Sequence, residues 1–100
     1  MTVAGSGATG RAIERKLARA LTPRRIDIVD ESELHRGHAG WREGGETHFR
    51  ITVVADAFAG LSRVERHREV NRILAEELAG PVHALSLTAL TPAEADRRGR

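Results

Sequence analysis

The sequence contains no cysteine, and this absence excludes two kinds of chemistry. No disulfide can form within these 100 residues, and the chain supplies no thiolate to a metal ion. Long apolar runs are missing too: no stretch approaches the roughly 18 residues that a membrane span needs, and the N-terminus lacks the apolar core of a signal peptide. We therefore expect a protein that resides in the cytoplasm.

Net charge is also small, although arginine is abundant. Lysine and arginine number 16 against 14 aspartates and glutamates, and the two signs are interleaved along the helical stretches, which is typical of a solvated surface. A short basic tail at residues 98–100 ends the chain, and a small, glycine-rich segment at residues 1–8 begins it as a predicted flexible leader. Residues 9–97 then form one small domain.

The first half of this domain shows one helical and two strand patterns. Apolar residues recur every four positions at Ile13, Leu17 and Leu21, a helical spacing that ends before Pro23. A β-branched run at residues 26–29 predicts a first strand. The alternation of apolar and polar residues over residues 48–53 predicts a second one.

The second half begins and ends with helix-capping signals. Ser62 and Glu65 form a capping box at the start of a charged amphipathic helix, which stops at residues 80–81, a Gly-Pro pair. Residues 82–90 predict a third strand, and Thr91 and Glu94 form another capping box. The predicted fold is therefore a small α/β domain of order α-β-β-α-β-α. Its three-stranded mixed sheet has an antiparallel hairpin followed by a right-handed parallel crossover.

A glycine-rich stretch from residue 32 to residue 45 shows no periodicity. Loops of about 14 residues are long for a compact domain and are usually functional. This one carries His35 and His38, which are either metal ligands or ordinary solvent-exposed loop histidines. A third histidine, His83, starts the apolar row of the last strand, where it is either a ligand or a partly buried side chain bonded to the backbone.

Residues 66–94, RHREVNRILAEELAGPVHALSLTALTPAE, resemble the signature of the BolA family, an Arg-His-Arg helix followed by a Val-His-Ala-Leu strand. The resemblance extends upstream through Asp-Glu-Ser at 30–32, Glu-Thr-His-Phe at 46–49 and Phe-Ala-Gly-Leu-Ser-Arg at 58–63, and it covers about nine tenths of the chain. It implies an α/β fold similar to the type II KH domain.

The resemblance also implies a function and a set of ligands. In BolA-like proteins the histidine at the position of His83 is a ligand of a [2Fe–2S] cluster, and the loop supplies a second ligand, here a histidine. His35 fits the loop pattern, with His38 in reserve. A monothiol glutaredoxin partner provides its active-site cysteine and bound glutathione as the remaining ligands. The implied role is an adaptor in iron–sulfur cluster maturation or trafficking.

Two further roles stay open on the residues alone. The helix arginines form a candidate surface for a partner or for DNA, as in a transcriptional regulator of the BolA type, and they are Arg63, Arg66, Arg68 and Arg72. A module that docks a partner without any metal is the third possibility. We expect His67 to be a packed side chain or one that supports a ligand, and His48 to line the outer face of the sheet in a structural role.

Two glycine motifs lack the context that their usual function needs. The G-x-G-x-x-G pattern at residues 5–10 has no preceding strand and no βαβ unit, so we do not expect dinucleotide binding. The G-x-x-G at residues 37–40 lies between two strands rather than two helices, so it does not correspond to the nucleic-acid loop of a KH domain. No catalytic motif is recognisable, and the sequence predicts a protein that is not an enzyme.

Overall fold

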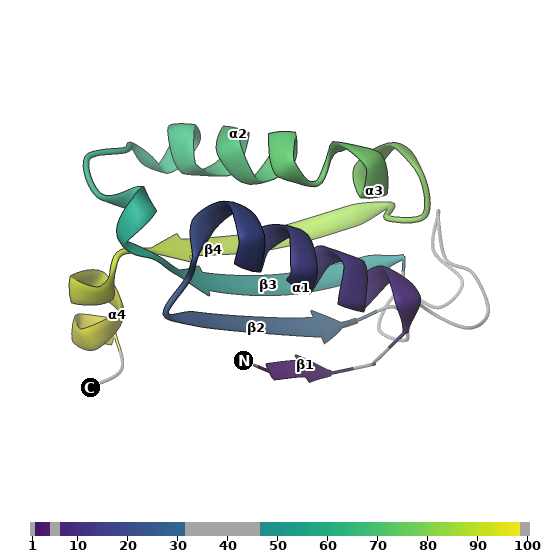
Figure 1. Cartoon of the computed structure of the whole chain (residues 1–100), viewed down its shortest axis with the longest axis horizontal. Coiled ribbons are helices and arrows are strands. Elements are labelled where there is room, and N and C mark those ends of the chain that lie inside the picture. The colour runs from purple at the N-terminus through teal and green to yellow at the C-terminus, as the bar shows by residue number, and fades with distance from the viewer. Residues whose placement is uncertain (1, 5–6, 32–46, 99–100) are drawn as a thin grey trace.

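One β-sheet runs through the molecule, with helices packed on one of its faces (Figure 1). The computed structural model describes residues 2–4, 7–31 and 47–98. The strands are β1 (Thr2–Ala4), β2 (Arg25–Asp30), β3 (His48–Val54) and β4 (Ala84–Leu90). The helices are α1 (Ala8–Leu21), the 3-10 turn η2 (Asp56–Phe58), α2 (Arg63–Ile73), α3 (Ala75–Ala79) and α4 (Pro92–Arg98). None of the described helices is long and apolar enough to cross a bilayer.

The pairing of the three predicted strands is confirmed. β2 and β3 are antiparallel, with Ile28 opposite Ile51, and β3 and β4 are parallel, with Ile51 opposite Leu87. The crossover from β3 to β4 runs through α2 and α3, as a parallel connection requires. The chain is therefore a mixed α/β domain, as the sequence predicts.

The N-terminal segment differs from the prediction of a flexible leader at residues 1–8. Thr2–Ala4 forms β1, which pairs in parallel with β2, and α1 begins at Ala8. The sheet therefore has four strands, in the order β1-β2-β3-β4, and not three. A strand thus precedes the glycine motif at residues 5–10, and β1, α1 and β2 form a parallel βαβ unit, contrary to the expectation that both are absent. Three residues are too few to show an alternating pattern, and the pairing depends on the otherwise open edge of β2, which lies more than twenty residues away in the sequence.

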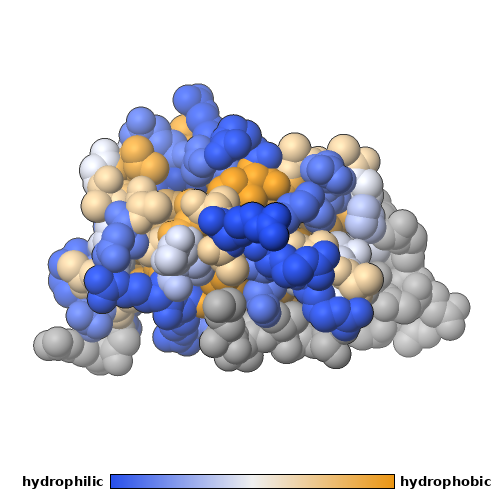
Figure 2. All heavy atoms as spheres, viewed as in Figure 1, coloured by the Kyte–Doolittle hydropathy of each residue, from blue (hydrophilic) through white to orange (hydrophobic). Residues whose placement is uncertain are grey.

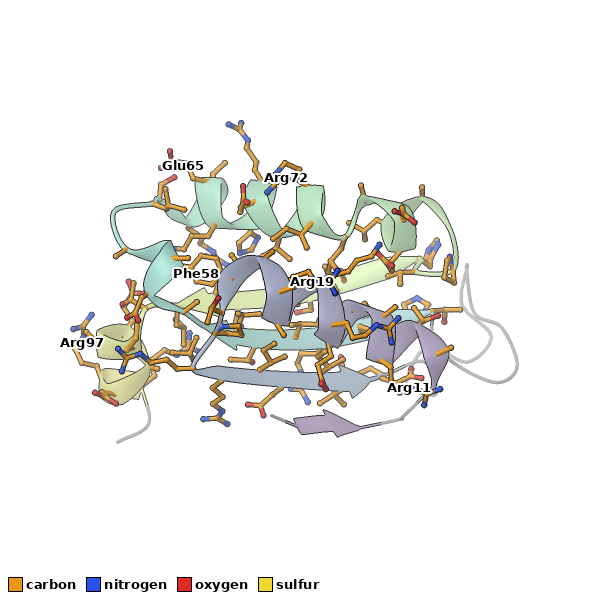
Figure 3. All side chains as sticks on the ribbon, viewed as in Figure 1. Arg11, Arg19, Phe58, Glu65, Arg72 and Arg97 are labelled. Atoms are coloured by element: carbon orange, nitrogen blue, oxygen red, sulfur yellow. The ribbon has the colours of Figure 1, made fainter. Side chains whose placement is uncertain are left out.

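The core lies between the sheet and the helices, on the face that the sequence periodicity indicates. The predicted stripe on α1 is fully buried at Ile13 and Leu17, and Val70 and Leu74 are the buried residues contributed by the second amphipathic stretch. They pack against the inward-facing side chains of β2 and β3, which are Ile26, Ile28, Phe49, Ile51 and Val53. Towards solvent the surface is mixed: hydrophilic side chains surround scattered apolar ones (Figure 2), and Glu65 and Arg72 point away from the sheet (Figure 3).

Both predicted capping boxes are present. The Ser62 N–H donates to Glu65 Oε1 at 2.8 Å and the Glu65 N–H donates to Ser62 Oγ at 3.1 Å. At α4 the Thr91 N–H donates to Glu94 Oε1 at 2.7 Å, with the Glu94 N–H 3.3 Å from Thr91 Oγ1. These bonds satisfy main-chain donors that a helix start leaves open, so each helix begins where the sequence indicates.

One charged pair joins the two helical segments across the core. Lys16 Nζ on α1 lies 2.8 Å from the Glu77 carboxylate on α3, and the Glu77 side chain is only 10% exposed. The hydrogen bond to Glu77 raises the pKa of Lys16 above its usual value, so the ammonium that the pair needs is retained. A buried carboxylate needs such a partner, and this pair fixes α3 against α1.

We expect Leu17→Ala to lower the free energy of unfolding by about 2–5 kcal/mol, because it leaves a cavity at a fully buried position between α1 and the sheet. Urea denaturation followed by circular dichroism measures this change. Val64→Ala is the matched control, since Val64 is 57% exposed and its truncation should stay within about 0.5 kcal/mol of the parent. Equal losses in the two variants would contradict this assignment of the core.

Candidate functional site

His83 stands at the entrance to β4 with its side chain exposed. Its main-chain N–H donates to the Thr47 carbonyl at 2.7 Å, and the N–H of Ala84 donates to the same oxygen at 3.1 Å. Two hydrogen bonds to one carbonyl hold the backbone of this junction, while the imidazole is left at the surface. The ring is therefore accessible to another molecule and is carried on a fixed backbone.

The second histidine at this junction is His48, which sequence reasoning placed on the outer face of the sheet. The structure shows it only 5% exposed, with its ring centroid 5.3 Å from that of His83 and the ring planes at 55°. Its Nδ1 lies 2.9 Å from Thr47 Oγ1. The signal that could have revealed this contact is the parallel register, in which His48 is opposite Ala84, the neighbour of His83.

The ends of the predicted functional loop lie at the same junction. The Glu31 N–H donates to the His48 carbonyl at 2.7 Å, and Thr47 accepts from His83 as described above. The chain therefore leaves the sheet at Glu31 and returns to it at Thr47, both within one hydrogen bond of the His48–His83 pair. His35 and His38 lie between these two points, outside the described residues. Among the described residues, no group of three or more His, Asp or Glu could hold a metal ion.

At the opposite end of β4, Arg66 joins three parts of the chain. Its guanidinium donates to the carbonyl of Leu61 at 3.0 Å, to that of Ala89 at 3.0 Å and to the Glu94 carboxylate at 2.6 Å. The same group lies 5.9 Å from the centre of the Phe58 ring, and its side chain is only 12% exposed. Arg66 is therefore an internal connector between α2, β4 and α4, and not the surface residue that the sequence predicts.

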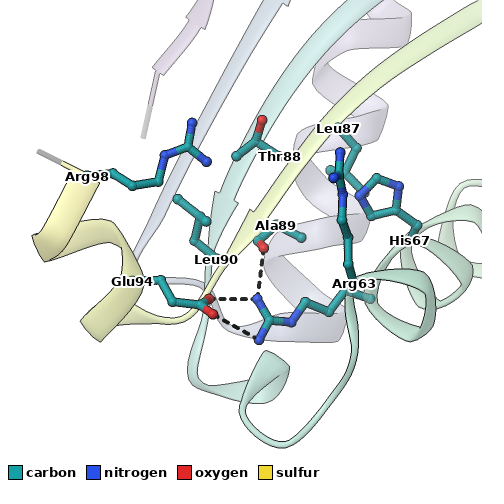
Figure 4. Close-up of a pocket in the computed structure, with 9 residues that line it drawn as sticks. Arg63, His67, Leu87, Thr88, Ala89, Leu90, Glu94 and Arg98 are labelled. Atoms are coloured by element: carbon teal, nitrogen blue, oxygen red, sulfur yellow. Dashed lines mark hydrogen bonds and ion pairs between the residues drawn. The ribbon is translucent and has the colours of Figure 1, made fainter.

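A groove of about 430 Å³ lies beside this connector. It contains His67, which is half-buried on the inward side of α2, and Leu87 of β4 (Figure 4). Its lining residues come from α2, β4 and α4, and they are Arg63, Arg66, His67, Leu87, Thr88, Ala89, Leu90, Glu94 and Arg98. The groove is separate from the histidine junction, because the two lie at opposite ends of β4.

The four arginines proposed as a surface have different surroundings. Arg66 is internal, and Arg72 forms an ion pair with Glu69 one turn away on the same helix. Arg63 has no ion pair among the described residues. Arg68 is exposed beside Glu65, whose pKa is lowered first by the Ser62 hydrogen bonds and in smaller part by this arginine. The positive field of α2 is thus weaker than its arginine content suggests.

Several known proteins that are similar to this chain carry one family name. A sequence model of the family described as "BolA-like protein" matches residues 17–94. Human "BolA-like protein 1" is 52% identical over 94 residues, which are 91% of this chain and 66% of that protein. The "DNA-binding transcriptional regulator BolA" of Vibrio cholerae is 43% identical over 82 residues, covering 82% of this chain and 74% of that protein. The solved "BolA domain of SufE1 from Arabidopsis thaliana" superposes with a TM-score of 0.80 at 44% identity, over 88% of this chain and 96% of that one. The chain thus spans just under two thirds of the human relative.

The Arg66–Glu94 pair leads to a prediction about pH. The Arg66 guanidinium, together with the Thr91 N–H, lowers the pKa of Glu94 from 4.5 to about 2. Because the folded-state pKa is depressed, the pair contributes its full stability above about pH 4.5 and loses it as the pH falls towards 2. We expect the urea midpoints of the parent and Glu94→Gln to differ at neutral pH and to converge over this range. Asp96→Asn is the control, since Asp96 is exposed on the same helix and forms no ion pair with the described residues; a gap of constant size down to pH 2 would contradict the assignment.

Proposed function

This chain belongs to the BolA-like protein family, and from that premise we propose that it shares a [2Fe–2S] cluster with a monothiol glutaredoxin and passes it on. His83 and His35 are the proposed ligands from this chain, with His38 as the alternative to His35. The glutaredoxin cysteine and glutathione complete the set. The protein then acts as an adaptor and not as an enzyme, and the cytoplasmic location expected from the sequence stays a prediction.

The observation that carries this proposal is the exposed imidazole of His83 on a fixed backbone. A side chain that ligates a cluster shared between two proteins must be exposed on the surface of its own protein. Its backbone must also stay fixed when the partner docks. The two hydrogen bonds to the Thr47 carbonyl supply the second property. Contact with the buried His48 ring restricts the orientations of the His83 imidazole. Residues that support a metal ligand commonly act in this way.

Chain length supports a ligand from the loop. His35 follows Glu31 by four residues, which span at most roughly 14 Å when extended. Glu31 is hydrogen-bonded to His48, whose ring contacts His83, so the tether is long enough for both imidazoles to bind one iron. The seven residues from Glu31 to His38 span roughly 24 Å, which also permits that alternative.

The missing cysteines support a shared cluster. Iron–sulfur clusters are held mainly by thiolates, and these 100 residues contain none, so at least two ligands must come from another molecule. Imidazole is a neutral ligand that replaces thiolate on one iron in Rieske centres. Mixed ligation at an exposed site keeps the cluster open to ligand exchange, which is the step that a carrier needs.

Reconstitution tests the proposal. An equimolar mixture with a monothiol glutaredoxin, glutathione, iron and sulfide is prepared without oxygen, and its visible absorption and circular dichroism are recorded. We expect a spectrum distinct from that of the glutaredoxin homodimer, because imidazoles replace thiolates in the mixed complex. His83→Ala should remove this spectrum, and His35→Ala or His38→Ala should alter it.

The control for these substitutions is His67→Ala, which removes a half-buried histidine at the far end of β4. It should leave the mixed spectrum unchanged. If His83→Ala gives the parent spectrum, or if His67→Ala changes it as much, histidine ligation by this junction is refuted.

DNA binding is the second candidate, favoured by the name of the Vibrio cholerae relative. Arg63 and Arg68 are the helix arginines that are not held in an ion pair within the described part of the chain. If they contact phosphates, Arg68→Gln should reduce the slope of log affinity against log salt by about one. Fluorescence anisotropy with a duplex at several salt concentrations measures this slope, and a slope near zero in the parent protein would remove this candidate.

A further inference from the structure

The outer edge of β4 carries main-chain groups that are not bonded to any described residue. β4 is the last strand of the sheet, and the Leu90 carbonyl accepts from the Ala55 N–H at 2.9 Å, on the side of β3. The Ala89 carbonyl faces the other way and accepts from Arg66. Because these directions alternate along a parallel strand, Leu85 and Leu87 present both their N–H and their C=O groups to the outer edge. The edge is therefore open over its middle.

The groove beside Arg66 encloses part of this edge from both faces of the sheet. Leu87 and Ala89 share the helix-facing side with His67, while Thr88 and Leu90 face the opposite side, where Arg98 lies (Figure 4). A volume of about 430 Å³ is within the usual range for binding sites of roughly 300–1,000 Å³. An additional strand paired with the outer edge of β4 would occupy the space that borders both faces of this strand.

The charge of this groove is positive. Glu94 is the acidic residue in its lining, and it is neutralised by Arg66. Arg63 and Arg98 have no ion pair within the described part of the chain, and they lie on the two sides of the edge (Figure 4). A strand placed here would therefore meet a cation on each of its faces.

We propose that an extended, acidic segment of another protein adds to β4 as a fifth strand. Its main chain pairs with the outward groups of Leu85 and Leu87, and its side chains point alternately towards Arg63 and towards Arg98. This is recognition by strand addition, in which the backbone supplies affinity and the flanking charges supply selectivity. The groove lies at the opposite end of β4 from His83, and the added strand runs from it along the edge as far as Leu85.

Two other occupants fit the observations less well. A second copy of this chain carries the same basic side chains beside its own β4 edge, so it offers no acidic complement to Arg63 and Arg98. Single-stranded nucleic acid is bound mainly by stacking on aromatic side chains, and the residues that line this groove include no Phe, Tyr or Trp.

Nuclear magnetic resonance of the ¹⁵N-labelled, cluster-free protein tests the proposal. The probe is the blocked peptide Ac-Val-Glu-Glu-Val-Glu-Glu-NH2, whose adjacent glutamates place carboxylates on both faces of an extended strand. It is compared with two copies that are N-methylated at alternate residues, one copy for each of the two possible frames. We expect larger amide shifts at Leu85 and Leu87 than at Ser86 and Thr88, and loss of binding for one methylated frame. Shifts that avoid the edge, or equal binding of all three peptides, would overturn strand addition.

Two arginine variants test the charge of the groove. Arg63→Gln should weaken the peptide about two- to five-fold, the range expected for an exposed ion pair. Arg15→Gln, the control, removes the same charge from an exposed position on α1 outside the groove and should leave the affinity unchanged. Equal weakening by both variants would overturn the site.

Two competing occupants are tested with the same apo protein. Tighter binding of an oligothymidylate than of the peptide at the same salt concentration would assign the groove to nucleic acid. A dimer in sedimentation experiments that dissociates when the peptide is added would assign it to a second copy of the chain. Either result overturns the proposal without affecting the cluster experiment, because neither uses His83 or a glutaredoxin.

Discussion

The parallel pairing of β3 with β4 is the constraint on which the rest of this structure depends. It places the beginning of β4 beside the beginning of β3, so that His83, Thr47 and His48 meet at one end of the sheet. An antiparallel fourth strand would bring His83 to the other end, near Ala55. The crossover through α2 and α3 makes the parallel arrangement possible, and it also buries Val70 and Leu74 against the sheet.

The same pairing leaves β4 at the edge of the sheet, and Arg66 covers only one end of that edge. Its guanidinium binds the outward carbonyl of Ala89 and the carboxylate of Glu94, so docking of α4 and protection of the strand depend on a single side chain. This explains why an arginine in the Arg-His-Arg motif is buried in a protein with abundant surface arginine. A guanidinium that leaves water needs acceptors in the right places, and the fold supplies them through four hydrogen bonds to Leu61, Ala89 and Glu94.

The three described histidines show how strongly surroundings determine what a residue can do. His83 is exposed at a strand entrance, His48 is buried against it, and His67 is half-buried in the groove of α2 and β4. The first is suited to bind a shared ligand and the second to orient the first. His67 lies one helical turn after Arg63, and both line the basic groove. His67 is therefore not part of the junction formed by His48 and His83.

Most of the fold could be predicted from the sequence, because its signals are local. The spacing of Ile13, Leu17 and Leu21, the alternation along β3 and the capping residues Ser62 and Thr91 report on neighbours within one or two turns. The Val-His-Ala-Leu motif at the start of β4 also identified His83 as a candidate cluster ligand at that end of the sheet. The order of the elements and the direction of the three main strands followed from these signals and from the length of the connections.

Tertiary structure decided what depends on residues far apart in the chain. β1 has no pattern of its own and exists because β2 offers an edge. The contact between the His48 and His83 rings depends on the register of β3 against β4, which local alternation does not reveal. Arg66 was indistinguishable from the other helix arginines until the strand and α4 brought acceptors to it. Local periodicity predicts on which face of a helix or strand a side chain lies. Register and packing determine which residues that side chain contacts.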